Sequence, residues 1–357
     1  MEKIFKDLKV VELAGVLAGP CVGYFFAELG ADVVKIENKK TNGDVTRSWK
    51  LNTENPKKTT SAYFWSVNAL KRHLFLDLTK ETDRKKVYKE VETADIVITN
   101  YKHGDDIKLK TDYKTLKKIK PDVIYASISG FGKDSKRTAY DLILQAETGY
   151  MFMNGQKDGP PTKMPVALVD VLAGHQLKEA ILIALLKRER TGKGSYVSSS
   201  LFDSAITSLT NQGTNWLIAG HIPQRIGSTH PNIAPYGELF ETKDKHLVTF
   251  AIGSNSQFMH LCEILELNIL LKDKRFANNQ YRNKNRLLLE NILNDKISQI
   301  TFKKLEKECL RLEVPFGKVR NMKEVFEIPQ SRKMLVPIKD DNKKKYTISS
   351  IAFKFHS

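Results

Sequence analysis

Cysteine is scarce in this sequence, with only Cys21, Cys262 and Cys309 among its 357 residues. The three are scattered along the chain and lack the close spacings that a bound metal ion requires. Small secreted domains that depend on disulfides use cysteine far more densely. We therefore expect no metal site, and a reducing compartment such as the cytoplasm.

Long apolar runs are missing as well, and no stretch reaches the length that a membrane-spanning helix needs. The N-terminus superficially resembles a signal peptide, because Lys3, Lys6 and Lys9 precede apolar residues. Glu12 interrupts that run, and further acidic residues follow in regular elements, so we expect no export signal and no membrane partner. Hydrophobic residues make up 41% of the chain, which predicts a globular protein large enough for two lobes.

Acidic residues are in the minority, with 41 Asp and Glu against 58 Lys and Arg, and the net charge is +17. Such a balance first suggests nucleic acid as a partner. The lysines, however, are spread over the whole chain, and no nucleic-acid-binding motif is visible. A solvated lysine-rich surface explains the charge best, and attraction of a small molecule with several phosphates comes second. We expect no nucleic-acid partner.

Apolar strand-like runs alternate with amphipathic or charged helical segments in the first part of the chain. This alternation predicts an α/β fold with a doubly wound parallel sheet, whose ligands bind beyond the carboxyl ends of the strands. The residues that follow two of these strands, 100–102 and 129–132, are then candidates for the rim of a ligand site. The expected strands cover residues 8–13, 31–37, 74–78, 94–100 and 123–128.

The first two strands and the helix between them resemble a dinucleotide-binding unit. Gly15 and Gly19 follow the first strand, and Glu37 ends the second. The tight spacing of three glycines is absent, so the sequence indicates a nicotinamide cofactor only weakly.

Residues 158–202 are the stretch around which the chain is organised. A turn at 158–161 leads into the apolar run 166–169, which stops at Asp170, and a helix is expected over 171–188. A carboxylate is costly to desolvate but electrostatically favoured at the start of a helix. Asp170 is therefore either a functional carboxylate or simply the N-cap of this helix, for which Asp is a preferred residue.

A second, smaller unit is expected in the C-terminal third of the chain. Residues 220–235 are rich in Gly, Pro and His and are predicted to be a linker. Strands are expected at 238–240 and 247–252, and helices at 257–265, 286–300 and 301–311; upstream, one helix is expected over 140–153. We predict a large domain over 1–220, a linker and small domain over 221–325, and a segment over 326–357 that returns to the large domain.

Several sequence blocks, in this order, resemble the class III CoA-transferases, the family of formyl-CoA transferase, the carnitine CoA-transferases and the α-methylacyl-CoA racemases. Each block alone is a weak signal, but their order over the first two-thirds of the chain is specific. The blocks are LAGVLAGP (13–20), LGADVVKIE (29–37), Gly43-Asp44 with Arg47, YDL (140–142), Val169-Asp170 with Ala173-Gly174, RERTGKG (188–194) and HPNIAPY (230–236).

The resemblance implies a Rossmann-like large lobe with a parallel sheet, a smaller α+β lobe and two chains interlocked as a homodimer. It also implies that Asp170 is the nucleophile, which forms an anhydride with the acyl group and then a thioester with CoA. An amide N–H near Asp170 or in the Gly253 loop would stabilise the oxyanions. Acyl-CoA and a small carboxylic acid are the expected substrates, with no tightly bound cofactor.

By the same resemblance, CoA contacts residues along the large lobe. We expect Lys102, Lys108 and Arg137 to bind phosphates, although a solvated surface role is an equal alternative in so basic a chain. The expected CoA-contacting residues are Val16, Leu17, Asn38, Leu76, Asp77, Asn100, Tyr101, Lys102, Lys108, Arg137, Ala139 and Tyr140.

Three functions are compatible with these residues. We favour CoA transfer, with succinyl-CoA as a possible donor because the 230–236 block resembles relatives that use it with dicarboxylic acids. A 2-methylacyl-CoA racemase or epimerase needs acid and base groups on both sides of the α-carbon. Tyr140 stands where the racemase branch has a His, and Ser254-Asn255 offers no carboxylate where that branch has a Glu. His175 is either another base or an ordinary helix residue. The end at Ser357, shorter than in typical relatives, leaves a non-catalytic CoA-binding protein as the third possibility.

Overall fold

The computed structural model describes residues 3–340 and 343–356. Two compact units make up the chain, and each is described here by itself. The larger unit comprises Met1–Tyr150, Lys163–Thr214 and Gln330–Ser357, and the smaller unit comprises Met151–Thr162 and Asn215–Pro329. The domain boundaries expected from the sequence, 1–220, 221–325 and 326–357, stay a prediction about independently folding domains.

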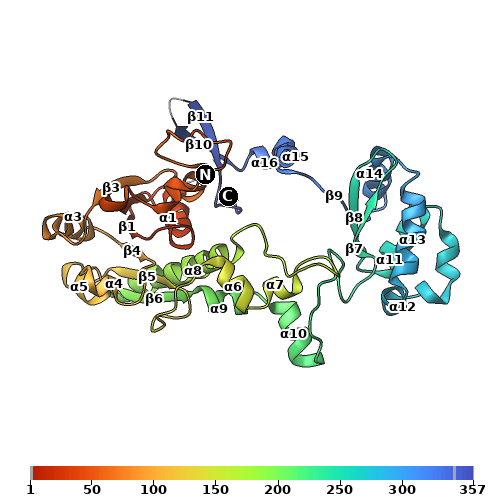
Figure 1. Ribbon diagram of the computed structural model, residues 1–357, viewed down its shortest axis with the longest axis horizontal. Helices are drawn as coiled ribbons and strands as arrows, with labels where there is room; N and C mark the ends of the chain where they lie inside the picture. Colours follow the sequence, from red (N-terminus) through yellow and green to blue (C-terminus); the bar gives the residue numbers. More distant parts are fainter. Residues whose placement is uncertain (1–2, 341–342, 357) are drawn as a thin grey trace. The chain divides into compact units, whose positions relative to one another are not determined.

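A six-stranded parallel sheet forms the centre of the larger unit, with the strand order β3-β2-β1-β4-β5-β6 (Figure 1). This is the strand order of the Rossmann fold, in which the direction of winding reverses between β1 and β4. The predicted α/β fold is confirmed. The strands are β1 (Lys9–Leu13), β2 (Asp32–Asn38), β3 (Arg72–Leu76), β4 (Ile96–Thr99), β5 (Ile124–Ser129) and β6 (Ser195–Ser200).

Consecutive apolar residues on the inner strands explain why helices cover the sheet on both faces. Successive side chains of a strand point to opposite faces, so Val10 and Val11 of β1 belong to two different core clusters. The cluster of Val10 includes residues of α1 (Ala18–Glu28) and α8 (Leu168–Thr191). The cluster of Val11 includes residues of α3 (Glu81–Val91) and α5 (Tyr113–Ile119).

Shorter elements complete the larger unit. The single helix expected over 140–153 is two helices, because Gly149 between them adopts φ +87°, outside the helical region. The tail returns to the core, where Ile351 is buried in the Val10 cluster. The other elements of this unit are η1 (Lys39–Thr41), η2 (Val45–Ser48), α2 (Ala62–Asn68), α4 (Asp105–Lys108), α6 (Asp141–Glu147), α9 (Leu201–Thr207), β10 (Leu335–Asp340) and β11 (Lys343–Ile348). The boundaries between the two units fall within α7 (Tyr150–Met153), α10 (Thr210–Ala219) and α16 (Pro329–Arg332).

The smaller unit packs helices on a three-stranded antiparallel sheet, β7-β8-β9. Its apolar core contains Phe240 and Val248 of the sheet together with Phe258, Leu293 and Leu305 of three helices. The elements are β7 (Tyr236–Glu241), β8 (Leu247–Ala251), α11 (Asn255–Ile264), η3 (Asn268–Lys272), η4 (Lys274–Phe276), α12 (Asn279–Lys284), α13 (Arg286–Ile297), α14 (Phe302–Arg311), β9 (Phe316–Lys318) and α15 (Met322–Glu327).

The segment predicted as a linker, 220–235, has no helix or strand, but the smaller unit holds its last part firmly. Arg286 Nη2 donates hydrogen bonds to the carbonyls of His230 and Ile233, and Arg282 Nε donates to that of Ala234. The side chains of Asn279 and Asn283 satisfy the two remaining carbonyls between 230 and 234. The HPNIAPY block is therefore an ordered part of this unit.

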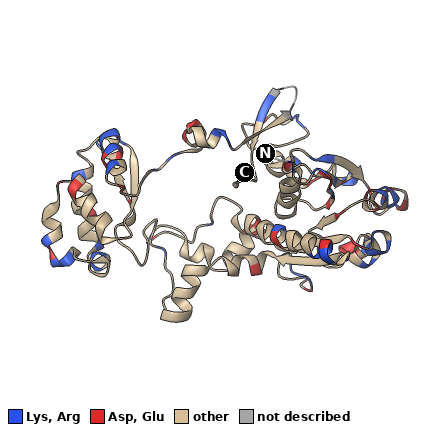
Figure 2. Ribbon diagram, turned by 180° about the vertical axis from the view of Figure 1, so that it is seen from behind, with Lys and Arg blue, Asp and Glu red and all other residues tan. Residues whose placement is uncertain are grey.

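Lysine and arginine occur on helices of both units, as Figure 2 shows in blue, and this agrees with their spread along the sequence. Within residues 3–340 and 343–356, none of the helices combines the length and the apolar character needed to cross a bilayer.

Candidate active site

Two cavities, of about 280 Å³ and about 390 Å³, lie at the carboxyl edge of the parallel sheet. Gly15 and Val16, which follow β1, line both cavities, and so does Tyr101, which lies beyond β4. The direction of winding reverses between these two strands, and Rossmann-type sheets bind their ligands at that point. We call the smaller one the first cavity and the larger one the second cavity.

The two cavities collect most of the residues predicted to contact a ligand. Lys108 lines neither of them, and its exposed ammonium group lies 3.2 Å from the Asp105 carboxylate. The predicted residues at the first cavity are Val16, Asn38, Leu76, Asp77 and Tyr101; those at the second are Val16, Leu17, Asn100, Tyr101, Lys102, Arg137, Ala139 and Tyr140, together with Asp170.

Asn100 ties the end of β4 to the loop that follows β1. Its side-chain oxygen accepts a hydrogen bond from Gly15 N at 2.9 Å, and its side-chain nitrogen donates to Gly15 O at 2.7 Å. Because one side chain satisfies both backbone groups of Gly15, it fixes the loop position between the two cavities.

Glu37 at the end of β2 is already occupied by protein donors. Its carboxylate accepts hydrogen bonds from Arg47 and from Asp44 N, and it pairs with the His73 ring at 2.8 Å. Burial alone would raise the pKa of Glu37, but these bonds together lower it well below its usual range. Glu37 therefore builds the turn at Gly43, and it does not present a free carboxylate to a nucleotide ribose.

Asn38 and Asp77 at the first cavity also interact with groups of the protein. Asn38 Oδ1 accepts a hydrogen bond from Lys40 N at 2.9 Å, and the Lys40 ammonium lies 3.2 Å from the Asp77 carboxylate. Lys40 also lines this cavity and was not predicted. The lysine pair 39–40, directly after a strand in a parallel sheet, was the signal that could have revealed it.

Asp170 is the third residue of α8, so of the two interpretations left open by the sequence, the one that makes it the N-cap of this helix is wrong. The helix begins at Leu168, and Ala167 is its N-cap. The side chain of Asp141 supplies the missing cap, because its Oδ1 accepts a hydrogen bond from Val169 N at 2.8 Å. Asp170 is thereby free of a capping role and lines the second cavity.

Asp170 is only 8% exposed, and its surroundings disfavour the charged form. Desolvation and, next to it, the negative charge of Asp141 raise the pKa of Asp170 to about 7. The Asp141 carboxylate is itself held by Gln145, whose Nε2 donates to Oδ2 at 2.7 Å and whose Oε1 accepts from Met164 N at 2.8 Å. Two carboxyl groups thus lie at the first turn of α8: that of Asp141 caps the helix, and that of Asp170 lines the second cavity.

Close packing of α8 on α1 places the start of α8 at the sheet edge. A side chain at Gly174 would put its Cβ 2.2 Å from Cys21 Sγ and 3.1 Å from Ala18 O, so only glycine fits there. This contact gives a structural reason for the Ala173-Gly174 pair that follows Asp170 by one turn.

The sequence profile of CoA-transferase family III matches residues 5–357. The chain belongs to this family. It is 36% identical over 329 residues to the succinate–glutarate CoA-transferase of Agrobacterium fabrum, covering 90% of this chain and 82% of that protein. It is 36% identical over 338 residues to the succinyl-CoA:glutarate CoA-transferase of the mouse, covering 92% and 74%. A CAIB/BAIF family protein from Brucella suis has a similar structure, with a TM-score of 0.81, 37% identity and coverage of 99% and 97%.

The predicted class III CoA-transferase is thus confirmed, and CoA transfer between an acyl-CoA and a carboxylic acid is its reaction. Cations of the transferase gather around the second cavity, where Lys102, Lys133, Lys136 and Arg137 are among the lining residues. Lys133 and Lys136 were not predicted, although the basic run that follows the 129–132 loop could have indicated them. Arg137 lies 3.8 Å over the ring of Phe131 and pairs with Glu147.

The loop 253–256 of the transferase forms the start of α11 in the smaller unit. Ser254 is the N-cap, and the Gln257 side chain accepts hydrogen bonds from Gly253 N at 2.8 Å and Ser254 N at 3.2 Å. These two amides already have an acceptor in this structure. The expectation that the Gly253 amide stabilises an oxyanion would require it to leave Gln257.

Proposed function

We propose that Asp170 is the nucleophile of this CoA-transferase. The observation that supports this role is the position of its carboxyl group, which is buried in the second cavity next to Asp141. A carboxyl group with a pKa of about 7 is more basic, and so more nucleophilic, than an ordinary aspartate, yet it is substantially ionised near neutral pH.

The reaction consists of four exchanges at the Asp170 carboxyl group. The carboxylate attacks the thioester carbonyl of acyl-CoA. The C–S bond then breaks, which releases CoA as a thiolate and leaves an anhydride between Asp170 and the acyl group. The thiolate attacks the Asp170 carbonyl carbon, which gives an aspartyl-CoA thioester and releases the donor acid. The acceptor carboxylate then attacks this thioester, and the thiolate finally attacks the acceptor's acyl carbon and regenerates the Asp170 carboxylate.

CoA is long enough to occupy both cavities, which share Gly15, Val16 and Tyr101. The reactive thiol must reach Asp170, so the pantetheine arm belongs in the second cavity and the adenosine part in the first. Lys102, Lys133 and Lys136 on the rim of the second cavity provide positive charge for the phosphates.

The substrates we propose are succinyl-CoA as donor and a small dicarboxylic acid as acceptor. Relatives at 35–36% identity are named for succinyl-CoA with glutarate or mesaconate, or for succinate and glutarate. A relative at 34% identity is named for acetyl-CoA and oxalate, so the acceptor needs a direct test.

We also propose that the enzyme works as an interlocked homodimer in the cytoplasm. Helix α10 leaves Trp216, Leu217 and Ile218 largely exposed in the single chain, up to 82% for Ile218, which suits burial against a second copy. The three cysteines are unpaired, as is usual in a reducing compartment.

The decisive experiment is incubation with succinyl-CoA and a panel of carboxylic acids, followed by mass spectrometry of the new CoA esters. Hydroxylamine added during turnover should mark Asp170 as a hydroxamate, and Asp170→Ala should abolish both the mark and the exchange. Asp203→Ala is the matched control, because Asp203 is likewise the third residue of its helix but is exposed and lines neither cavity. Exchange by Asp170→Ala at the wild-type rate would refute the proposal.

A further inference from the structure

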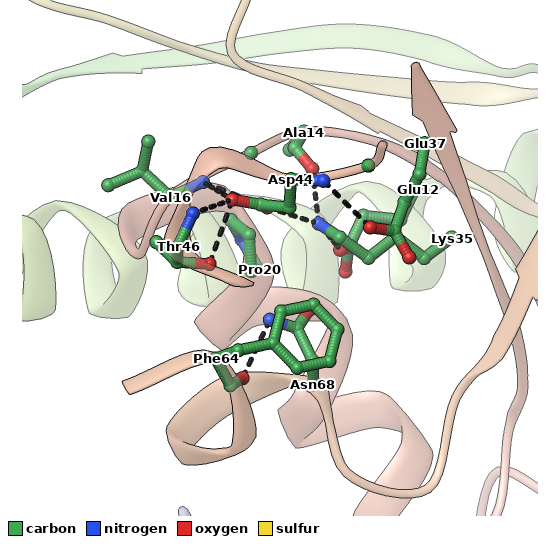
Figure 3. A network of polar contacts seen from close by, with 12 residues as sticks. Glu12, Ala14, Val16, Pro20, Lys35, Glu37, Asp44, Thr46, Phe64 and Asn68 are labelled. Atoms are coloured by element: carbon green, nitrogen blue, oxygen red, sulfur yellow. Dashed lines mark hydrogen bonds and ion pairs between the residues drawn. The ribbon is translucent and has the colours of Figure 1, made fainter. Parts of the chain in front are cut away.

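Four charged residues with buried side chains, Glu12, Lys35, Asp44 and Lys71, form a cluster next to the loop that follows β1. Figure 3 shows Glu12, Lys35 and Asp44 of this cluster. Lys35 Nζ lies 3.0 Å from Glu12 Oε1 and 3.0 Å from Asp44 Oδ2, and Lys71 Nζ lies 2.7 Å from Glu12 Oε2. We call this group the buried charge cluster. Its two carboxylates and two ammonium groups balance, as buried charges must.

The sequence of α1 leaves room for this cluster. A Cβ atom at Gly23 would lie 1.9 Å from Glu12 Oε2, so any other residue would displace the carboxylate. Burial opposes the charge on Lys35, but Glu12 and Asp44 outweigh burial and raise its pKa. Burial lowers the pKa of Lys71 to about 8, which leaves it mainly protonated at neutral pH.

The cluster binds backbone atoms on both sides of the loop that separates the two cavities. Lys35 Nζ donates to Ala14 O at 2.6 Å, and Lys71 Nζ donates to Pro20 O at 2.8 Å. Between these two points, Asp44 Oδ2 accepts a hydrogen bond from Val16 N at 3.1 Å. A cluster that served stability alone would have no need to converge on one short loop.

Val16 is the residue of this loop that most needs to be held. Its φ of +67° lies in the left-handed region, which is highly unfavourable for a β-branched residue. Asn100 fixes Gly15 on one side, and Asp44 holds the Val16 amide itself. Thr46 keeps the Asp44 carboxylate in place, because its N and Oγ1 donate to Oδ1 at 3.0 and 2.8 Å.

We propose that the buried charge cluster is a positioning device for CoA, in which Asp44 holds Val16 in the left-handed conformation and so sets the wall shared by the two cavities. This inference rests on the proposed function, because it takes CoA to be the ligand of both cavities. Asp44 is a positioning residue in this role, since it acts through the backbone of Val16.

The first test compares Asp44→Asn with the wild-type enzyme. The asparagine keeps the size of the side chain but loses the charge that pairs with Lys35 and one of the two acceptor oxygens. We expect the KM for acyl-CoA and the Kd for free CoA to rise about tenfold, the factor that corresponds to one lost hydrogen bond. The kcat should stay within about twofold, because ground-state and transition-state binding weaken together.

The second test repeats the substitution in a Val16→Gly background. Glycine adopts a positive φ without strain, so the Val16 backbone no longer depends on Asp44. We expect Asp44→Asn to change the KM by less than about threefold in that background, which is the coupling that a double-mutant cycle detects. An equal effect on the KM in both backgrounds would show that Asp44 acts on CoA independently of the Val16 backbone, for example from its own place in the lining of the first cavity, and would overturn the inference.

Asp95→Asn is the matched control, because Asp95 accepts a hydrogen bond from Lys9 N at the opposite edge of the sheet. It should lower the melting temperature without changing the Kd for CoA. If Asp44→Asn does not fold, Thr46→Val makes the same comparison. It should raise the KM by a smaller factor in the wild-type background, and this rise should be smaller still in the Val16→Gly background. A wild-type enzyme that does not bind CoA would refute the proposed function, whereas normal binding by the variants refutes only this inference.

Discussion

Glu37 and Asp170 are both buried carboxylates of the larger unit, with exposures of 3% and 8%, but their neighbours are opposite in kind. Burial opposes the charge on Glu37, but Arg47, His73 and a backbone amide donate to it and lower its pKa. Asp170 is desolvated too, but the charge beside it is the negative one of Asp141, so its pKa rises to about 7. The pKa of a buried carboxyl group is thus lowered at one position of the larger unit and raised at another.

The kind of neighbour distinguishes a carboxylate that stabilises the fold, such as Glu37, from one that is available to react, such as Asp170. Glu37, Asp44 and Glu12 each have partners that satisfy their charge, and Glu37 and Asp44 also accept hydrogen bonds from backbone amides of a turn or loop. Asp170 is costly to ionise where it stands, which is typical of a reactive group in a cavity. The following substitutions test this contrast.

The largest effect is expected at Asp170 itself. Asp170→Asn keeps the volume of the side chain but replaces the proposed nucleophile with an amide, so turnover should fall by about 10⁴-fold or more. The measurement is the transfer of labelled CoA between succinyl-CoA and an acid acceptor. Binding of CoA should persist in the variant, and measurable transfer within tenfold of wild type would show that another group attacks the thioester.

A structural carboxylate should instead matter for stability. Glu12→Gln leaves Lys35 and Lys71 with an uncompensated buried charge, so the free energy of unfolding should fall by about 3–5 kcal/mol. Asp32→Asn, which breaks the exposed pair with Arg72, should change it by less than about 0.5 kcal/mol. Urea unfolding of the two variants measures the difference, and equal losses would contradict the role of the cluster.

Loss of the Asp170 carboxylate should raise the free energy of unfolding, whereas loss of the Glu12 carboxylate should lower it. The pKa of Asp170 is raised in the folded state, so the protonated form stabilises the fold below about pH 4 and this contribution is lost as the pH rises through about 7. Asp170→Asn removes the ionised group, and the variant should be more stable than wild type by up to about 4 kcal/mol at pH 8. Unfolding curves at pH 8 and pH 4 should show this gain at the higher pH only.

The smallest effect concerns the Asp141 charge. Asp141→Asn removes one of the two causes that raise the pKa of Asp170, so the acid limb of kcat/KM, expected near pH 7, should move to lower pH. The pH profile is measured with acyl-CoA well below KM. An acid limb that does not move would mean that desolvation alone sets the reactivity of Asp170.

Much of the larger unit could be predicted from the sequence because its signals are local. The predicted strands 31–37 and 94–100 contain consecutive apolar residues, at 33–34 and 96–98, which is typical of buried parallel strands. Asp170 stood out because an apolar run, a carboxylate and a helical pattern follow one another directly, and the family resemblance then made it the candidate nucleophile. The boundaries were less accurate, since α8 begins at Leu168, before its first predicted residue.

The surroundings of Asp170 and the buried charge cluster could not be predicted in the same way. Asp141 lies 29 positions before Asp170, and it reaches the start of α8 only because α6 packs against that helix. Glu12, Lys35, Asp44 and Lys71 are likewise separated by long stretches of chain. Nothing in their spacing distinguishes them from the many other charged residues of a basic protein.

The sequence by itself determined most of the order of strands and helices, because backbone preferences act over a few neighbouring residues. It also marked Asp170 as a carboxylate at the start of a helix, and the family resemblance made that residue the candidate nucleophile. Only the tertiary structure decided which carboxylates are neutralised and which one is left reactive. Burial and Coulomb interactions depend on distance in space, and the fold alone brings residues such as Glu12 and Lys71 together while it places Asp141 beside Asp170.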